Sequence, residues 1–238
     1  MLLMKLLSIQ TSAIQEITAQ GTEAWWDRAW STGFYKQPVT EPLWLGYEGL
    51  KGDQQADRRY HGGSEKAVCV YASEHYPYWQ EKLGQVEMLN GAFGENFTTA
   101  GSLEHEVSIG DVYALGEARL QVSQPRQPCW KLARRWRVKD LTAQMERTGF
   151  TGFYFRVLQH GKVHAGAEFT LMERPFPNWT IALANEIMHH RRADKDAARE
   201  LAECPLLSAS WKDSLWSRSL TSLEEQDAAK KRRTENAT

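Results

Sequence analysis

The sequence predicts a mainly β protein with some helix. It divides into a large first domain over residues 1–175, a small three-helix domain over residues 176–220 and a charged tail over residues 221–238. Two observations support this division. Short apolar runs separated by turn residues dominate the first domain. After the proline-containing stretch RPFPNW, apolar residues recur at helical spacing instead.

Several segments of the first domain are predicted strands. LLSIQTSAI, at residues 6–14, is short and apolar, and AVCVY, at residues 67–71, is typical of a buried strand. VSIGDVYAL and the alternating segment EARLQVSQ meet at a tight turn at Gly116 and Glu117, which predicts a hairpin. GFYFRVL and AEFTLME are further strands, separated by the glycine-containing stretch QHGKVHAG.

Two helices are predicted within the first domain. The segment SEHYPYWQEKL begins at Ser73, an expected N-cap, and Pro77 must then lie in its first turn. The segment DLTAQMERTG has Asp140 as its expected cap and apolar residues four positions apart. Gly149 follows it and is expected to end the helix.

Three short helices are predicted after the proline-containing stretch. They cover TIALANEIMHH, DKDAARELAEC with Asp194 as its cap, and SASWKDSLWSRSL. Their apolar stripes are formed by Ile181, Ala184 and Met188 in the first helix, and by Trp211, Leu215, Trp216 and Leu220 in the third. The residues after these helices are charged and poor in apolar groups, so the tail is expected to be disordered.

The composition indicates a protein of a reducing compartment. The chain has 238 residues, a formal net charge of −1 and three cysteines. So few cysteines, in an odd number, argue against a disulfide framework, and we expect a cytoplasmic protein. The chain has neither a broad basic stretch nor an apolar run of the roughly 20 residues that cross a bilayer, so neither nucleic acid nor a membrane is an expected partner. Trp25, Trp26 and Trp30 suit a core or a homodimer face equally.

One cysteine stands in a distinctive setting. The stretch SQPRQPCWKL places Cys129 beside two prolines and two basic residues, Arg126 and Lys131. The prolines restrict the backbone and remove ladder hydrogen bonds. Positive charge nearby favours the thiolate, which is the nucleophilic and metal-binding form. Cys129 is therefore a candidate functional residue, with packing as the alternative, whereas Cys69 and Cys204 fit a packing role.

The stretch YHGGSEK is a weaker signal. Gly62 and Gly63 follow His61 directly, and consecutive glycines allow backbone N–H groups to approach an anion closely. Lys66 would add a point charge and His61 a neutral donor or acceptor. The pattern alone favours an ordinary turn before a buried strand, because it matches neither a Walker loop nor a dinucleotide fingerprint.

The stretch NGAFGENFTTAG is a second weak signal of a binding site. Its glycines surround Glu95 and Asn96, a carboxylate and an amide that can pair with the edge of a heterocycle. Taken alone, the pattern favours an ordinary glycine-rich loop with Glu95 in solvent.

These stretches together carry a family resemblance. STGFYKQPV, GLKGDQQADRRYHGGSEKAVCVYASEHYPYW, GAFGENFTT and IGDVYALGEARLQVSQPRQPCWKL occur in this order and resemble the YiiM-like branch of the MOSC family. The resemblance runs from about Met4 to Leu220. It implies a β-barrel-like MOSC domain followed by the three-helix domain of this branch, and binding of the molybdenum cofactor. One departure is Lys51, where many relatives carry an acidic residue, which would change charge at the rim.

The resemblance also implies the pocket residues. They are Cys129 of PRQPCWKL as the molybdenum ligand, His61 and Lys66 of HGGSEK, Glu95 and Asn96 of FGEN, and Gln124 and Arg126 of SQPR. The cofactor is a pterin with a dithiolene and a phosphate. Arg126 can bind the phosphate through two N–H groups, whereas Lys66 acts as a point charge. Gln124 and Asn96 can contact the pterin edge.

Relatives in this family reduce N-hydroxylated compounds, including hydroxylaminopurine base analogues. The resemblance therefore implies oxygen removal from an N–OH substrate at reduced molybdenum, with Glu95 or His61 as the proton donor. A thiolate at Cys129 suits molybdenum, which prefers soft ligands. Two electrons must come from outside, since the sequence contains no flavin, haem or iron–sulfur motif. A separate electron-donating reductase is the expected partner.

Two other interpretations stay open. The protein could be a non-catalytic carrier of the molybdenum cofactor, or a sulfur-transfer module with a persulfide on Cys129. It could instead be a cysteine-dependent hydrolase or a pyridoxal-phosphate binder using Lys66, although the sequence places no base beside Cys129. A cofactor-loaded protein that accepts electrons without reducing N-hydroxylated compounds would favour the carrier.

Overall fold

The computed structural model describes residues 4–84 and 88–226. Its strands are β1 (Lys5–Thr11), β2 (Gln15–Ile17), β3 (Trp30–Thr32), β4 (Gln37–Val39), β5 (Leu43–Gly46), β6 (Gly49–Leu50), β7 (Val68–Ala72), β8 (Phe97–Ala100), β9 (Val112–Leu115), β10 (Ala118–Pro125), β11 (Phe153–Gln159), β12 (Gly161–Val163) and β13 (Thr170–Glu173). Its α-helices are α1 (Tyr76–Leu83), α2 (Trp130–Trp136), α3 (Leu141–Thr148), α4 (Ile181–Asn185), α5 (Lys195–Ala202) and α6 (Ala209–Leu220). Short 3₁₀ turns cover Trp25–Asp27, Ser64–Lys66 and Ser73–His75, and a π-helical turn covers Glu186–His190.

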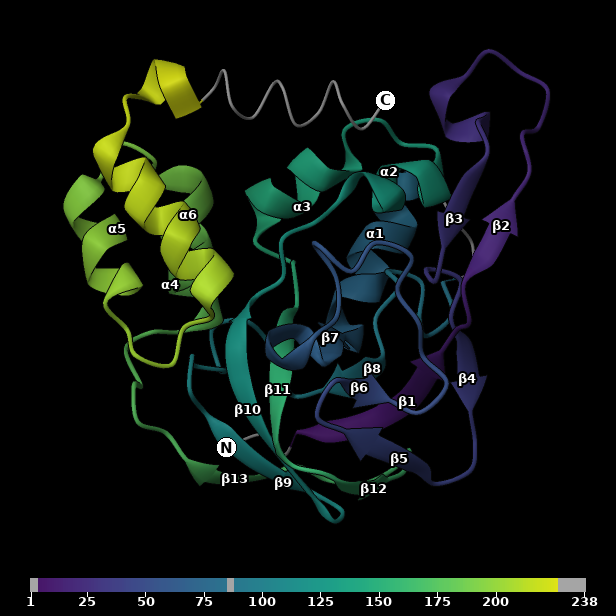
Figure 1. Cartoon of the computed structure of the whole chain (residues 1–238), viewed down its shortest axis with the longest axis horizontal. Coiled ribbons are helices and arrows are strands. Elements are labelled where there is room, and N and C mark those ends of the chain that lie inside the picture. Colours follow the sequence, from purple (N-terminus) through teal and green to yellow (C-terminus); the bar gives the residue numbers. More distant parts are fainter. Residues whose placement is uncertain (1–3, 85–87, 227–238) are drawn as a thin grey trace.

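An eight-stranded curled sheet forms the body of the molecule (Figure 1), with the strand order β13-β9-β10-β11-β7-β8-β1-β4. Its neighbouring strands are antiparallel, except for the parallel pair β7 and β8. Backbone hydrogen bonds also join β1 to the segment before β13: Leu6 N donates to Ala167 O at 2.9 Å, and Phe169 N donates to Met4 O at 2.9 Å. These bonds bring the two sides of the sheet together, and the predicted β-barrel-like fold is confirmed.

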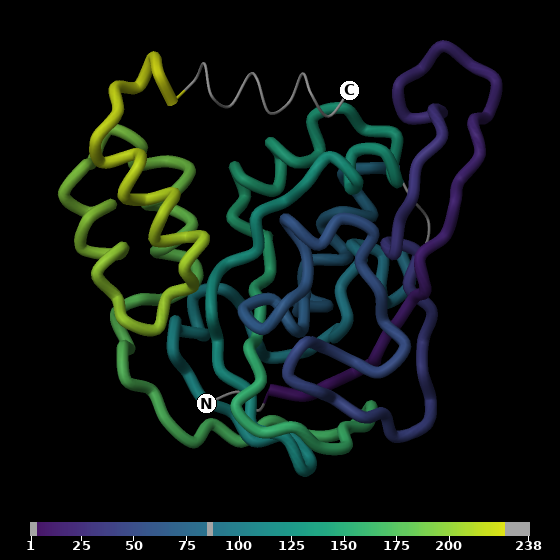
Figure 2. Tube along the Cα trace, viewed as in Figure 1, coloured from purple at the N-terminus to yellow at the C-terminus, as the bar shows by residue number. Residues whose placement is uncertain are grey.

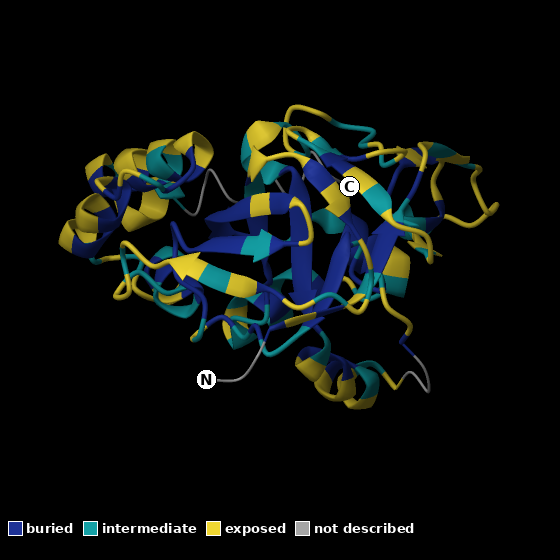
Figure 3. Cartoon of the chain, turned by 90° about the horizontal axis from the view of Figure 1, so that it is seen from below, coloured by how far each residue is buried: buried dark blue, intermediate teal, exposed yellow. Residues whose placement is uncertain are grey.

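One hydrophobic core fills the curled sheet and continues into the carboxy-terminal helices. Strand β10 is buried from Leu120 to Pro125, because the sheet curls over its inner face and the helices cover its outer face. Trp211 and Leu215 of α6 are fully buried in the same core. Figure 3 shows the central strands buried and the outer faces of the helices exposed. The three-helix layer is thus packed firmly onto the strand that leads to the Cys129 turn.

A second, aromatic-rich cluster packs α1, α2 and α3 together. It contains Trp79 of α1, Leu132 of α2 and Met145 of α3, all fully buried. The hairpin of β2 and β3 projects from the body beside these helices (Figure 2), and Arg134 of α2 anchors it by donating to Trp26 O at 3.0 Å. This cluster fixes α2, whose first residue follows Cys129 directly.

The predicted strands are confirmed, and shorter ones were missed. The hairpin pairs β9 with β10, with Ala118 opposite Leu115 and Gly116 at a φ of 57° in the turn. The other predicted segments correspond to β1, β7, β11 and β13. Strands β2 to β6, β8 and β12 have two to four residues each, which is too short for an alternating pattern to appear.

The helix termini of the first domain are partly as predicted. Pro77 lies in the first turn of α1 and Gly149, at a φ of 73°, ends α3. The prediction that Ser73 caps α1 is wrong, because a separate 3₁₀ turn precedes the helix. Asp140 occupies the N-cap position of α3, yet its carboxylate accepts from the Gln144 side chain at 2.9 Å and makes no capping bond.

The carboxy-terminal helices form where predicted. Asp194 caps α5 by accepting from Ala197 N at 2.9 Å. The apolar stripe predicted for α6 is confirmed for one pair of residues and wrong for the other. Trp211 and Leu215 are buried, but Trp216 is 41% exposed and Leu220 is 77% exposed. Trp216 and Leu220 follow Leu215 by one and five positions, so their side chains point away from the packed face of the helix.

The predicted tail falls mainly on residues 227–238, outside the described residues, while residues 223–226 form a short helical turn. The boundaries at residues 175 and 220 stay predictions, since one core spans both parts of the fold. Within the described ranges, no helix combines the length and apolar character that a bilayer span requires.

Candidate functional site

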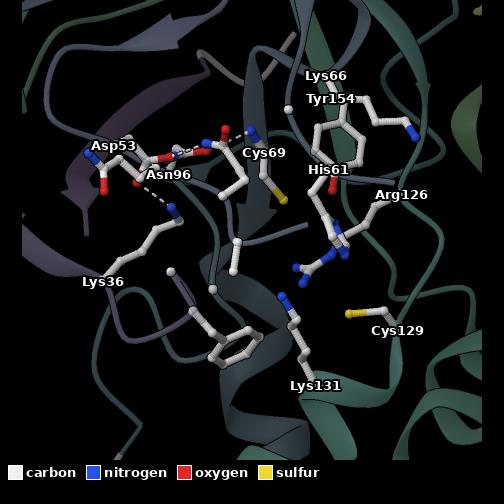
Figure 4. A pocket seen from close by; sticks show the side chains of 17 residues that line it. Lys36, Asp53, His61, Lys66, Cys69, Asn96, Arg126, Cys129, Lys131 and Tyr154 are labelled. Atoms are coloured by element: carbon white, nitrogen blue, oxygen red, sulfur yellow. Dashed lines mark hydrogen bonds and ion pairs between the residues drawn. The ribbon is translucent and has the colours of Figure 1, made fainter. Parts of the chain in front are cut away.

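A pocket that is partly open to solvent lies where several loops meet at the ends of β7, β8 and β10. Its wall comes from five segments, at residues 33–36, 53–56, 61–66, 94–96 and 126–131, and from the side chains of Cys69 and Tyr154. Figure 4 shows its labelled side chains. Of the residues predicted for the site, those in the wall are Cys129, His61, Gly62, Lys66, Asn96 and Arg126.

Cys129 lies between the last residue of β10 and the first residue of α2. It has extended backbone angles, φ −119° and ψ 163°, and occupies the N-cap position of α2. Its carbonyl accepts from Leu132 N at 3.1 Å. The strand, the prolines and the helix therefore fix this half-buried residue from both sides, as the sequence predicted.

The Cys129 thiol is an unusually strong acid for a cysteine. Burial alone would raise its pKa, but a hydrogen bond with His61 and the charges of His61 and Arg126 outweigh burial. With the backbone N–H of Lys131, they lower the pKa to about 7. Near neutral pH about half of the molecules therefore carry a thiolate here.

Two glycines shape the turn that brings His61 to Cys129. Gly62 has a φ of 73° and Gly63 a φ of 79°, values in the left-handed region that favours glycine. A Cβ on Gly62 would also lie 2.5 Å from Oε1 of Gln55. Gly62 lines the cavity and Gly63 is not in its wall, while the predicted approach of their N–H groups to an anion stays a prediction.

Three cations face this end of the cavity. Arg126 is buried and donates through Nη2 to Phe93 O at 2.6 Å, but its buried Nη1 has no protein partner. Lys131 is also buried and points into the cavity (Figure 4), and its ammonium has no hydrogen bond or ion pair among the described residues. Lys66 is half-buried, donates to Tyr60 O at 2.9 Å, and has a pKa lowered by burial.

The Arg126 guanidinium is stabilised in its charged form. Burial alone would lower its pKa, but the neighbouring Cys69, Tyr154 and Cys129 side chains raise it above the usual value. A permanent positive charge therefore lies in the wall close to the Cys129 sulfur. Two of its neighbours, Cys69 and Tyr154, belong to strands on the inner side of the cavity.

Asn96 lines the cavity but has little hydrogen-bonding capacity left for a ligand. Its Nδ2 donates to Gln10 O at 3.2 Å and to Oδ2 of Asp53 at 2.9 Å, and its Oδ1 accepts from Cys69 N at 3.1 Å. Both donor hydrogens are used within the protein. Asn96 therefore joins the wall segments together, and its predicted contact with the pterin edge receives no support from this geometry.

Glu95 lies behind the wall, not in it. It is fully buried, and its carboxylate accepts from Tyr76 Oη, Gly91 N, Phe93 N and Thr98 Oγ1. These four donors occupy both oxygens, so the group orders the glycine-rich loop. The expectation that Glu95 lies in solvent is wrong, because the residue is fully buried. The proton-donor role predicted for Glu95 receives no support from this geometry and stays a prediction.

Gln124 also faces away from the cavity. Its Oε1 accepts from Ser208 Oγ at 2.7 Å and from Ser210 Oγ at 3.3 Å, and its Nε2 donates to Pro125 O at 3.1 Å. Ser208 N additionally donates to Ser123 O at 3.0 Å. This geometry gives no support to the predicted cofactor contact of Gln124, which stays a prediction, because the side chain links β10 to the start of α6.

Cys69 is more than a packing residue. It lies in β7 and is buried, yet its side chain lines the cavity and is hydrogen-bonded to Tyr154. Burial raises the pKa of the Cys69 thiol, although the charges of Arg126 and Lys36 oppose this. The sequence pattern AVCVY predicts the strand correctly, but it does not reveal which strand face meets the cavity.

The sequence reasoning also missed two wall residues, Lys36 and Asp53. They form an ion pair whose side chains are only 6% and 3% exposed. Both fall in stretches that carry the family resemblance, STGFYKQPV and GLKGDQQAD. A lysine and an aspartate in polar loops are commonly solvated, so no pattern marked them as a buried pair.

Two family models match the chain. A MOSC domain matches residues 57–170, and a YiiM-like, 3-alpha helix domain matches residues 179–218. The first model covers most of the cavity wall, and the second covers the helices packed on β10.

Individual proteins are also similar to this chain in sequence and structure. YflK of Bacillus subtilis is 46% identical over 183 residues, which are 77% of this chain and 82% of that protein. A protein named Reductase from Gibberella moniliformis is 34% identical over 179 residues, 74% of this chain and 32% of that protein. The crystal structure of YiiM from Geobacillus stearothermophilus has a TM-score of 0.75 at 38% identity, covering 91% of this chain and 99% of that one. The chain therefore belongs to the MOSC family, in its YiiM-like branch.

Proposed function

We propose that this protein is a molybdenum-cofactor-dependent reductase of N-hydroxylated compounds, such as hydroxylaminopurine bases. The observation that carries the proposal is the Cys129 thiol, whose pKa is lowered to about 7 in the wall of a cavity that is also lined by the cations Arg126, Lys131 and Lys66. A thiolate held in a rigid turn is a suitable ligand for a soft metal. The relationship to a fungal protein named Reductase supports a reductive activity.

The donor set fits the molybdenum cofactor. Cys129 offers a single soft anionic ligand, which suits a metal already held by dithiolene sulfurs. Nη1 of Arg126 is buried and has no hydrogen-bond partner among the described residues, and the Lys131 ammonium, which lies over the Trp130 ring, points into the same cavity. These two groups are suited to a phosphate. When bound, the cofactor supplies the two-electron redox chemistry.

The residues of this chain would position the substrate and deliver protons. Reduction of an N–OH group to N–H consumes two electrons and two protons, breaks the N–O bond and releases water. His61 is the remaining candidate for a proton donor, because it lines the cavity beside Cys129 while Glu95 is fully bonded behind the wall. The electrons would come from a separate reductase protein.

The proposal is tested by a reduction assay on protein produced in molybdate-supplied cells. With an artificial reductant such as dithionite-reduced viologen, we expect the wild type to convert 6-hydroxylaminopurine to adenine, measured by chromatography, at a rate proportional to its molybdenum content. Cys129→Ala should lose at least about 99% of this rate. Wild-type protein that contains molybdenum but produces no adenine would contradict the proposal and favour the carrier.

One observation favours a second candidate. His61 lowers the pKa of the Cys129 thiol, as the base next to the nucleophile does in cysteine hydrolases, and this neighbour was not expected from the sequence. Such an enzyme would act without molybdenum. Ester or thioester cleavage by metal-free wild type, abolished by Cys129→Ala and by His61→Ala, would support it over the reductase.

A further inference from the structure

The cavity has a second polar end, formed by the buried ion pair of Lys36 and Asp53. Figure 4 shows this pair across the cavity from Cys129 and Lys131. The charges of Lys36 and Arg126 both act on the Cys69 thiol, so Cys69 lies between the two polar ends of the cavity. The proposed cofactor contacts account for the Cys129 end and leave Lys36 without a role.

The acceptor side of the pair is saturated. Oδ1 of Asp53 accepts from Ser12 N at 3.0 Å and from the Lys36 ammonium. Oδ2 accepts from Gln55 Nε2 at 2.9 Å and from Asn96 Nδ2 at 2.9 Å. Four donors hold the carboxylate in place, so Asp53 is a fixed counter-charge with no acceptor capacity directed at a ligand.

The donor side is not saturated. An ammonium has three N–H donors, and the described residues supply one acceptor for Lys36, the Asp53 carboxylate. The Lys36 side chain is 6% exposed and lines the cavity, so water satisfies the remaining donors poorly. This end of the cavity is therefore suited to a ligand that brings a hydrogen-bond acceptor.

The cavity wall beside Lys36 contains one aromatic side chain, Phe34, which is largely buried. Phe34 lines the cavity two residues before Lys36, and Phe34 O accepts from Lys36 N at 2.9 Å. Gly94 packs against its ring, since a Cβ at that position would lie 2.7 Å from the ring carbons. An aromatic face beside a fixed donor matches a planar heterocycle with a ring nitrogen or carbonyl.

We propose that Lys36 determines the substrate specificity of the reductase. Its ammonium, fixed by Asp53, donates a hydrogen bond to a ring nitrogen or carbonyl of a planar N-hydroxylated heterocycle that lies against Phe34. This inference rests on the proposed function and deepens it. A substrate without the acceptor leaves a buried cation partly unsatisfied, so it is discriminated against about ten- to hundred-fold in kcat/KM.

The test compares two planar substrates, 6-hydroxylaminopurine and N-phenylhydroxylamine, which lacks ring acceptors. For the wild type we expect kcat/KM at least about ten-fold higher for the purine. Lys36→Met should lower the purine value about ten- to hundred-fold and change the phenyl value less than about three-fold, with unchanged molybdenum per chain. Lys82→Met, at an exposed lysine of α1 outside the cavity wall, is the matched control and should change neither value.

Three results would overturn the inference. Equal kcat/KM of the wild type for both substrates would do so even if Lys36→Met failed to fold, because that comparison needs no variant. An equal loss of both activities in Lys36→Met would assign Lys36 a structural role. Loss of molybdenum from Lys36→Met would place it among the cofactor contacts.

A binding measurement separates this inference from the proposed function. If the molybdenum-loaded wild type reduced neither compound, the proposed function would be wrong, and calorimetry with adenine would then decide the inference. We expect adenine to bind Lys36→Met about ten-fold more weakly than the wild type. Unchanged adenine affinity would overturn the inference.

Discussion

Cys69 and Cys129 line the same cavity and both lie near Arg126, yet their pKa values move in opposite directions. The pKa of Cys129 is lowered to about 7, and that of Cys69 is raised above its usual value. Both thiols experience burial, which raises the pKa. Cys129 also has a hydrogen bond with His61 and a backbone N–H from Lys131, while Cys69 is hydrogen-bonded to Tyr154.

The difference shows that the neighbouring His61, more than burial, decides which cysteine is reactive. Cys69 is held in β7, whose residues are all buried, so its thiol remains protonated. Cys129 follows a proline-rich turn at the start of α2, where a backbone N–H and the His61 ring are free to stabilise a thiolate. A single cavity thus contains one ionisable and one inert thiol.

The largest expected effect is in alkylation. In metal-free wild type at pH 8, iodoacetamide should modify Cys129 at least about 100-fold faster than Cys69, because only the first is largely ionised and half-exposed. The Cys129 rate should rise with pH through about 7 and then level off. Peptide mass spectrometry measures both rates. Comparable rates would contradict the inferred difference in ionisation between the two cysteines.

A smaller effect is expected from removing the histidine. His61→Ala eliminates the hydrogen bond and charge that stabilise the thiolate, so the pKa of Cys129 should rise above about 7. The alkylation rate at pH 7 should fall about three- to ten-fold, while the rate at pH 10 stays near the wild-type value. An unchanged pH profile would show that Arg126 and the backbone suffice.

The smallest effect concerns the strand that carries the Cys129 turn. Gln124→Ala removes the acceptor for Ser208 and Ser210, so thermal or urea unfolding should show a loss of about 1–2 kcal/mol. Gln127→Ala, at an exposed position of the same turn, should change stability by less than about 0.5 kcal/mol. A Gln124→Ala variant of normal stability with reduced molybdenum would restore the cofactor role first predicted for it.

The fold was largely predictable because its main elements are long enough to show a period. Strands β1, β7, β10 and β11 and the capped helix α5 follow from apolar spacing and one cap residue. Closure of the curled sheet was not predictable from local patterns. It depends on β1 bonding to residues 167–169, more than 150 positions away in the chain.

The site residues can also be separated into those that the sequence could predict and those that it could not. Cys129 could be recognised from its prolines and basic neighbours, and His61 from its glycine turn. Glu95 lies between the wall residues Gly94 and Asn96 in sequence, but adjacent side chains of an extended segment point to opposite sides. Gln124 instead contacts Ser208, which lies 84 positions away in the chain, and no local pattern shows this contact. The Lys36–Asp53 pair joins two loops, and only the folded chain brings them together.

The central claim is that Cys129 holds molybdenum and Cys69 does not. We would count molybdenum per chain by mass spectrometry in wild type, Cys129→Ala and Cys69→Ala purified from molybdate-supplied cells that make the cofactor. The account predicts near-stoichiometric metal in the wild type and in Cys69→Ala, and at least a ten-fold lower content in Cys129→Ala at an unchanged melting temperature. Equal molybdenum in Cys129→Ala and the wild type, or none in the wild type, would contradict it.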